Sequence, residues 1–343
     1  MCRPDALITN PPYPTIPLTA IILALSLAGA GCAAHPAPTP QSPRIDHVII
    51  LGIDGLSYES LATANVPHMR FVMENGAYTL NARTVLPTVS KPNWASMMMG
   101  ASPVEHGVTT NAWRPDNPQI EPAAKGPGGI FPTIFGVLRQ QRPAAKTAVF
   151  YEWGEMRYIF EPYAVDVLEP YTGAYMEQTE PSDKIMARAL NHITHYKPAL
   201  TYIDLDLVDY AGHHHGWNTP DYLQAVQDAD SYVGCTLAAI KQAGIQNSTI
   251  LFIVSDHGGM GESHGGYSRA EMLVPWMLIG PGVRPGHQIS SRVNLYDTAP
   301  TVAHLLRLNP PNAWIGRPVL DALDGAPACP SAALRVQSPL HDP

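Results

Sequence analysis

The chain has 343 residues, of which 45% are hydrophobic and 15% are charged. A charged share this low excludes long disordered segments driven by charge, and the length allows one large domain or two of ordinary size. The 21 Lys and Arg residues against 29 Asp and Glu residues give a net charge of −8. This balance excludes a broad basic surface for nucleic acid, so we expect a mostly folded globular protein without such a surface.

The first 31 residues are typical of an export signal. Residues 18–30 (LTAIILALSLAGA) are uncharged and mostly apolar, and the prolines before them leave too little helix for a membrane span. Residues 27–32 (LAGAGC) resemble a bacterial lipobox except at Gly29, so both lipidation of Cys32 and ordinary cleavage after a small-residue site stay open. We expect an exported protein that is periplasmic, anchored to the outer membrane through Cys32, or secreted.

Two cysteines remain outside the leader region, Cys235 on a predicted helix and Cys329 in a proline-rich tail. Export would permit them to pair, but two free thiols fit the sequence equally well. The cysteines therefore do not indicate a function.

In chain order, a proline-rich spacer over residues 32–43 precedes a single catalytic domain over 44–326, and a flexible tail covers 327–343. Four short apolar runs, each followed by polar or turn residues, predict buried strands: Val48–Ile53, Thr147–Phe150, Ala199–Leu205 and Thr249–Val254. The clearest helix is predicted over Pro220–Ala243, with Thr219 as its cap and Gly244 at its end. Strands that alternate with helices predict an α/β fold, with a largely parallel central sheet between layers of helices.

Candidate metal ligands follow three of the predicted strands. Asp54 follows the first strand, Asp206 and Asp209 follow the third, and the pair Asp256 and His257 follows the last. Open α/β sheets place their ligand sites at this edge. His213 lies four residues after Asp209, and His264 lies seven after His257. Carboxylates and imidazoles together suit Zn²⁺ or a similar divalent ion.

A further segment, residues 86–107, contains Ser90 in the run PTVSKPN and continues to Gly100, Pro103, His106 and Gly107. This pattern resembles the nucleotide pyrophosphatase/phosphodiesterase branch of the alkaline phosphatase superfamily. Asp54, residues 209–216 (DYAGHHHG), 255–258 (SDHG) and 264–266 (HGG) match further motifs of that branch in the same order. Ordered motifs over residues 44–320 are far more specific than any one of them.

The resemblance implies two divalent metal ions, with zinc the best match, in an alkaline-phosphatase-like fold. One ion would be held by Asp209, His213 and His264, and the other by Asp54, Ser90, Asp256 and His257. Ser90 would attack the phosphoester as an alkoxide and form a phosphoseryl intermediate, while the Asn93 amide would donate to a phosphoryl oxygen. The expected partner is a small phosphoester substrate.

Several neighbouring residues permit more than one interpretation. In this branch an aromatic residue usually follows the nucleophile, but here that position is Lys91. Its side chain either binds an extra anionic group of the substrate or points to solvent. Trp94 either lines the substrate pocket or packs in the interior, and the same alternatives hold for Trp113, Trp153 and Tyr158. The remaining members of the motifs are expected to be structural: Met97–Met99 in the core, Asp204 and Asp206 near the ligands, and His214 and His215 beside His213.

Four alternatives compete with a phosphodiesterase. A phosphomonoesterase would need additional positive groups, for which the sequence offers Lys91 and Arg157. A sulfatase shares the fold, but its nucleophile motif has an arginine where this chain has Trp94. A cofactor-independent phosphomutase would carry a long inserted domain, for which residues 107–200 are too few. An inactive surface-binding relative is disfavoured because every expected ligand is present.

Overall fold

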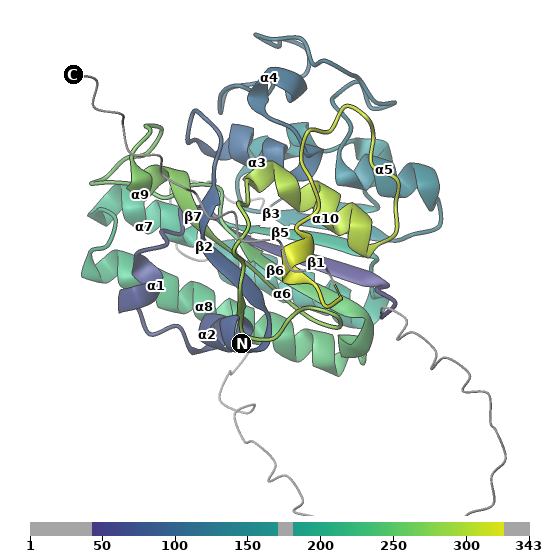
Figure 1. Cartoon of the computed structure of the whole chain (residues 1–343). Coiled ribbons are helices and arrows are strands. Elements are labelled where there is room, and N and C mark those ends of the chain that lie inside the picture. Colours follow the sequence, from purple (N-terminus) through teal and green to yellow (C-terminus); the bar gives the residue numbers. More distant parts are fainter. Residues whose placement is uncertain (1–42, 171–180, 326–343) are drawn as a thin grey trace, which may run out of the picture.

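The computed structural model describes residues 43–170 and 181–325 (Figure 1). The predicted leader, nearly all of the spacer and the predicted tail lie outside these residues. In the described part, no helix combines the length and the apolar character that a membrane crossing requires. Cys235 lies on a buried helix face and is disulfide-bonded, whereas Cys329 lies outside the described residues.

The described residues form one eight-stranded sheet with the order β4-β3-β5-β1-β6-β7-β2-β8. The strands β3, β5, β1 and β6 pair in parallel, whereas β7 is antiparallel to both of its neighbours. The bounds are β1 (His47–Ile53), β2 (Ala77–Arg83), β3 (Thr147–Tyr151), β4 (Val167–Pro170), β5 (Leu200–Leu205), β6 (Thr249–Val254), β7 (Leu273–Ile279) and β8 (His287–Gln288). The four strands predicted from sequence are β1, β3, β5 and β6, and the largely parallel sheet is confirmed.

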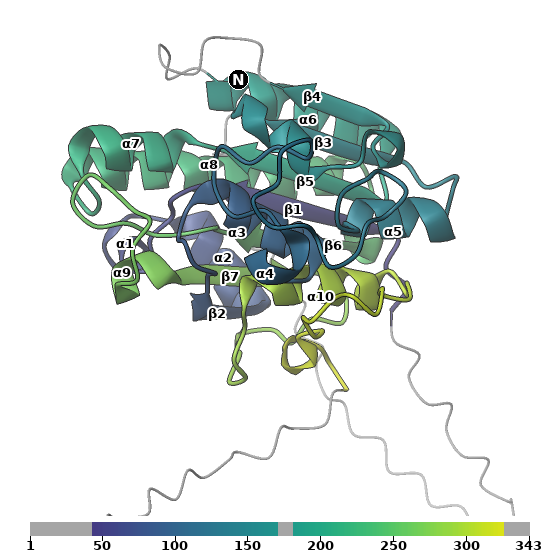
Figure 2. The ribbon, with the colours of Figure 1, turned by 90° about the horizontal axis from the view of Figure 1, so that it is seen from above.

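Helices cover both faces of this sheet, as the view from above shows (Figure 2). Their bounds are α1 (Ser60–Thr63), α2 (Pro67–Asn75), α3 (Ser90–Met99), α4 (Pro103–His106), α5 (Ile134–Gln141), α6 (Pro181–Tyr196), α7 (Leu207–His215), α8 (Pro220–Gln242), α9 (Arg269–Met272) and α10 (Thr298–Leu305). The predicted long helix is α8, where the Thr219 side chain accepts from the Tyr222 amide and Gly244 adopts a positive φ of 68°.

The alternation of side chains along β1 divides the interior into two cores. Val48 and Ile50 face a core shared with α3, α5 and α10, whereas Ile49, Leu51 and Ile53 face a core shared with α2, α6 and α8. Both sets are almost fully buried, which is why β1 reads as a continuous apolar run in the sequence. The chain therefore has the three-layered α/β/α architecture that its pattern predicts.

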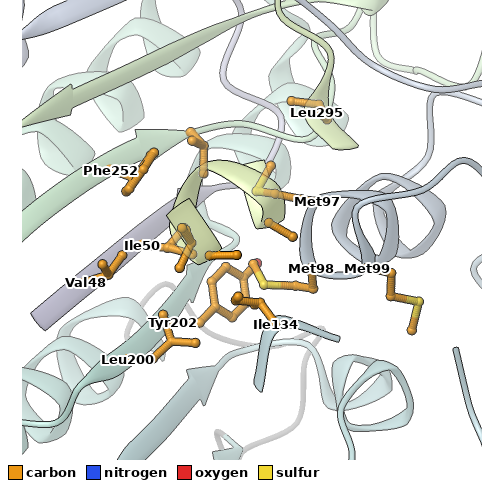
Figure 3. Packing of buried hydrophobic residues seen from close by; sticks show 14 of the residues in the cluster. Val48, Ile50, Met97, Met98, Met99, Ile134, Leu200, Tyr202, Phe252 and Leu295 are labelled. Atoms are coloured by element: carbon orange, nitrogen blue, oxygen red, sulfur yellow. The ribbon is translucent and has the colours of Figure 1, made fainter. Parts of the chain in front are cut away.

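The methionine run on α3 packs into the first of these cores. Met97, Met98 and Met99 are all 0% exposed and belong to the same core cluster, and Figure 3 shows Met97 and Met98 near Ile50, Tyr202 and Ile134. Their expected role in core packing is confirmed. The core thus fixes α3 against the sheet, and α3 begins at Ser90.

Candidate active site

Three adjacent strands deliver the candidate ligands to one edge of the sheet. The strand register pairs Ile53 with Leu205 and Gly52 with Val254, so the residues that follow β1, β5 and β6 emerge side by side. Asp54 follows β1 directly, and Asp256 comes two residues after the end of β6. The third set comes from α7, which starts immediately after β5 and presents Asp209 and His213 one turn apart.

The first ligand group contains Asp54, Asp256 and His257, whose ligand atoms lie within 4.8 Å of one another. His257 Nε2 is 3.4 Å from Asp54 Oδ1 and 3.3 Å from Asp256 Oδ2. The same nitrogen is 3.3 Å from the Ser90 hydroxyl oxygen. All four side chains are buried, so the predicted nucleophile lies at the predicted metal ligands.

The second ligand group contains Asp209, His213 and His264. His213 Nε2 is 3.1 Å from His264 Nε2 and 3.5 Å from Asp209 Oδ2. The rings of His257 and His264 stack with their centroids 3.7 Å apart. The two groups are therefore neighbours, with one imidazole of each in contact.

Backbone carbonyls orient all three imidazoles. The Nδ1 atoms of His213, His257 and His264 lie 2.8 to 3.0 Å from carbonyl oxygens of Glu262, Gly258 and Thr88. Because a carbonyl only accepts, Nδ1 carries the hydrogen and Nε2 keeps a free lone pair. Burial also lowers the pKa of His257, and it lowers that of His264 to about 3, so both rings are neutral, which is the form that binds metal.

The carboxylates fit divalent cations on independent grounds. Asp54 Oδ1, Asp209 Oδ1 and Asp256 Oδ2 are buried and have no hydrogen-bond partner among residues 43–170 and 181–325. Burial raises the pKa of the Asp209 and Asp256 carboxyls well above its usual value, and the neighbouring carboxylates raise it further. Buried like charges with unpaired oxygens need a cation. Together with neutral imidazoles they fit two zinc-like ions.

Comparison with known proteins now identifies the family. The model of the type I phosphodiesterase/nucleotide pyrophosphatase family matches residues 48–279, which include every candidate ligand and Ser90. The chain belongs to this family. It therefore also belongs to the alkaline phosphatase superfamily, as the ordered motifs predict.

Sequence and structural relatives agree with this assignment. Ectonucleotide pyrophosphatase/phosphodiesterase family member 1 of Mus musculus is 24% identical over 233 residues, which cover 64% of this chain and 25% of that protein. The match thus spans only a quarter of that relative. Murine member 5, in an inactive form with AMP, has a TM-score of 0.62 at 16% identity and covers 78% of this chain and 96% of its own. A mutant of the alkaline phosphatase PafA has a TM-score of 0.66 at 11% identity, with coverages of 82% and 99%. These structures confirm the alkaline-phosphatase-like fold.

The family motif correctly places Asn93 three residues after Ser90, but the structure gives its side chain another role. Asn93 is 0% exposed. Its Oδ1 accepts from the Val85 amide at 2.8 Å, and its Nδ2 donates to the carbonyls of Pro87 and Val89 at 3.1 and 2.9 Å. Both amide hydrogens are used, so the expected donation to a phosphoryl oxygen is corrected. Asn93 instead shapes the loop that leads into the nucleophile.

Asn111 is a site residue that the sequence analysis missed. Its Oδ1 accepts from the backbone N–H of Lys91 at 2.9 Å, directly after Ser90. Among the described residues its Nδ2 has no hydrogen-bond partner, so this group is the available amide donor beside the nucleophile. Its signal in the sequence is weak, since it is a single asparagine in the irregular segment after Gly107.

Trp94 lies in the interior, so its proposed contact with substrate is also corrected. The side chain is 0% exposed, and its Nε1 donates to Asp54 Oδ2 at 3.2 Å. The ring lies against β1 so closely that a Cβ at Gly52 would meet it at 2.7 Å. Trp94 therefore positions the candidate metal ligand Asp54 from the protein interior.

Lys91 is buried as well, which excludes the solvent-facing alternative. Its ammonium donates to the Trp113 carbonyl and to Glu155, both at 2.9 Å. It also lies 5.4 and 5.5 Å from the ring centroids of Trp153 and Tyr158. These aromatic side chains therefore surround the lysine. Burial lowers the Lys91 pKa, while the contact with Glu155 opposes that shift.

Further acidic side chains lie at the same sheet edge. Asp204 and Asp206 at the end of β5, and Glu152 directly after β3, are buried. In the described part of the chain, each of them has an oxygen without a hydrogen-bond partner. Burial raises the pKa of all three, that of Glu152 to about 7. Glu152 was not singled out from sequence, although it follows its strand just as Asp54 follows β1. His214 and His215 lie on the exposed last turn of α7 rather than in the ligand groups.

We predict that Trp94→Phe weakens metal binding about 10- to 100-fold, the usual cost of losing a partner that orients a ligand. The ring volume is nearly kept, but Asp54 loses its indole donor. Competition with a zinc-binding dye measures the affinity. Trp276→Phe is the matched control, because this buried indole donates to Thr298 rather than to a ligand. Equal affinities for the two variants would contradict the role of Trp94.

Proposed function

We propose that this protein is a metal-dependent phosphodiesterase or nucleotide pyrophosphatase that cleaves a small phosphoester through a phosphoseryl intermediate on Ser90. The observation that carries the proposal is the position of the Ser90 hydroxyl, 3.3 Å from His257 Nε2 within a complete pair of ligand groups. Membership of the phosphodiesterase family supports the same class of reaction.

The two ligand groups would hold two divalent ions. The combination of carboxylate and imidazole donors favours zinc. Asp209, His213 and His264 would hold one ion, and Asp54, Asp256, His257 and the Ser90 oxygen the other. Bound there, the ions would supply Lewis-acid charge that lowers the pKa of the Ser90 hydroxyl and stabilises the departing oxygen. The carboxylates provide the compensating negative charge.

The residues of the chain perform the remaining tasks. Asn93 and the core contacts of α3 hold Ser90 in place, so that its oxygen can attack phosphorus and form the phosphoserine as the ester oxygen leaves. The free Nδ2 of Asn111 donates to a non-bridging phosphoryl oxygen as charge develops on it. Water then cleaves the phosphoserine and restores the hydroxyl.

The main alternative is a phosphomonoesterase, because Lys91 follows Ser90 directly and its ammonium shares the Glu155 carboxylate with Arg114. A sulfatase is less well supported, since the position of its motif arginine holds Trp94, which is buried against Asp54. A surface-binding protein without activity is disfavoured by the intact ligand groups.

We also propose that the domain over residues 44–326 acts outside the cytoplasm on a small substrate. The apolar leader and the disulfide at Cys235 support export, since disulfides persist in oxidising compartments. Whether Cys32 carries a lipid is decided by mass spectrometry of the mature N-terminus.

The proposed function is tested with three substrates that share one leaving group: bis(p-nitrophenyl) phosphate, p-nitrophenyl phosphate and p-nitrophenyl sulfate. We expect the diester to have the highest kcat/KM, two zinc ions per chain by elemental analysis, and loss of activity on chelation. A tenfold preference for the monoester, about 1.4 kcal/mol, would establish the phosphomonoesterase instead. A single Ca²⁺ with sulfate hydrolysis would establish the sulfatase.

Ser90→Ala should abolish hydrolysis, because no other hydroxyl takes the place of its oxygen at His257. The fold and most of the metal content should remain, since three ligands of that ion and all ligands of the other persist. Turnover of bis(p-nitrophenyl) phosphate and metal analysis measure both. Near-normal turnover of Ser90→Ala, with Thr88→Ala inactive, would disprove the assignment of the nucleophile.

Asn111→Ala should lower kcat about 100-fold, the usual cost of one donor to a developing oxyanion. The comparison is Asn75→Ala, which removes an exposed amide from α2 and should leave kcat unchanged. An effect of Asn111→Ala on stability alone, with kcat of the folded enzyme unaltered, would show that this residue is structural.

A further inference from the structure

Three cationic side chains gather next to the nucleophile around a single carboxylate. Lys91, Arg114 and Arg157 surround Glu155 and Tyr158, and we call these five residues the cationic cluster. Glu155, Arg157 and Tyr158 come from one short 3₁₀ helix over Gly154–Ile159, and Lys91 follows Ser90 directly. Three positive charges against one negative charge leave this cluster at +2 in a chain whose net charge is −8.

Lys91 connects the cluster to the catalytic serine. Its backbone N–H is held by Asn111, while its ammonium reaches in the other direction to Glu155. The side chain is fully buried, so it cannot itself meet a substrate group in solution. Its role is structural: the ammonium holds the Glu155 carboxylate in place, so that one lysine side chain links Glu155 to the backbone next to Ser90.

The two arginines provide the accessible charge. Arg114 forms two hydrogen bonds to Glu155, and its guanidinium lies 4.2 Å from the centroid of the Tyr158 ring. Arg157 lies 4.7 Å from the same centroid and donates to the Tyr158 hydroxyl at 2.7 Å. Arg157 is exposed and, among the described residues, has no carboxylate within ion-pair distance. Its guanidinium therefore has no direct carboxylate partner among these residues and is open to an anion from solution.

This arrangement disfavours a nucleobase and favours an anion. The ring of Tyr158 is already in contact with two guanidinium groups, so its surface is not free for a base to stack on. Guanidinium groups held in place by an aromatic ring form strong paired hydrogen bonds with carboxylate and phosphate groups. The backbone N–H of Lys91 contacts Asn111, whereas its ammonium contacts Glu155, so the cluster and the proposed phosphoryl donor Asn111 meet opposite ends of the same residue.

We propose that the cationic cluster binds a second anionic group of the substrate, a carboxylate or a phosphate. This inference rests on the proposed phosphodiesterase function. In an in-line displacement the leaving group departs on the side opposite Ser90. The cluster extends from the residue next to Ser90, so the anionic group belongs to the part of the substrate that remains on the phosphoserine. The preferred substrate is thus a diester with an acidic retained half.

The test uses three diesters with the same p-nitrophenolate leaving group: p-nitrophenyl butyl phosphate and its analogues with a terminal carboxylate or a terminal phosphate on the butyl chain. Because the leaving group is constant, differences in kcat/KM report recognition of the retained half. We expect the two acidic diesters to exceed the butyl diester by about tenfold in the wild-type holoenzyme. The carboxylate and phosphate arms identify which anion is preferred.

We define the selectivity ratio as kcat/KM for an acidic diester divided by kcat/KM for the butyl diester. Arg157→Gln should lower this ratio about tenfold. Arg157→Lys, which keeps the positive charge, should have a ratio between those of Arg157→Gln and the wild type. Arg70→Gln is the charge-matched control, because it removes one arginine from α2, which packs on the other face of the sheet. Its ratio should stay within twofold of the wild type. Binding to the Ser90→Ala holoenzyme, measured by calorimetry with and without Arg157→Gln, should show the same loss in Kd without turnover.

Three results would overturn the proposal. An unchanged ratio and unchanged Kd in Arg157→Gln would show that the cluster is structural, while the phosphodiesterase function would stand. A loss confined to the monoester p-nitrophenyl phosphate would show that the cluster reads the transferred phosphoryl group instead. No hydrolysis of any diester by the wild-type holoenzyme would refute the proposed function, and this inference with it.

Discussion

The site depends on the parallel pairing of β1 with β5 and β6. Parallel neighbours end at the same edge of a sheet, so the carboxylates that follow these strands are forced together, whatever their mutual repulsion. Within the part of the chain that the structure describes, Asp54, Asp209 and Asp256 have buried oxygens without a hydrogen-bond donor. The fold thus concentrates negative charge at this edge, which bound cations would compensate.

The sheet and the ligands were predictable because both follow simple patterns. Buried parallel strands are continuous apolar runs, and a candidate ligand within three residues of the end of such a run can be picked out without knowledge of tertiary packing. Asp54, Asp256 and His257 belong to this kind. His213 was distinguished from His214 and His215 by the family resemblance, whose motif places a histidine four residues after Asp209, and α7 puts these two side chains one turn apart.

The roles of the residues after Ser90 were not predictable from the same motif. A helix turns by about 100° per residue, so Lys91, Asn93 and Trp94 point in three different directions from α3. The motif fixes their positions along the chain but not which neighbours they meet. Asn111 and Arg114 come from an irregular segment without periodicity, and only the folded chain shows that they return to the start of α3.

The close contact between Trp94 and Gly52 has a consequence for how this sequence can change. Any side chain at position 52 would displace the indole, and the indole donates to Asp54, which is two residues further along the chain and directly after β1. A smaller residue at position 94 would make room but would abandon the carboxylate. A substitution at position 52 is therefore tolerated only together with one at position 94, and the reverse also holds. An evolutionary path that changes one position first must pass through a protein in which Asp54 is misplaced.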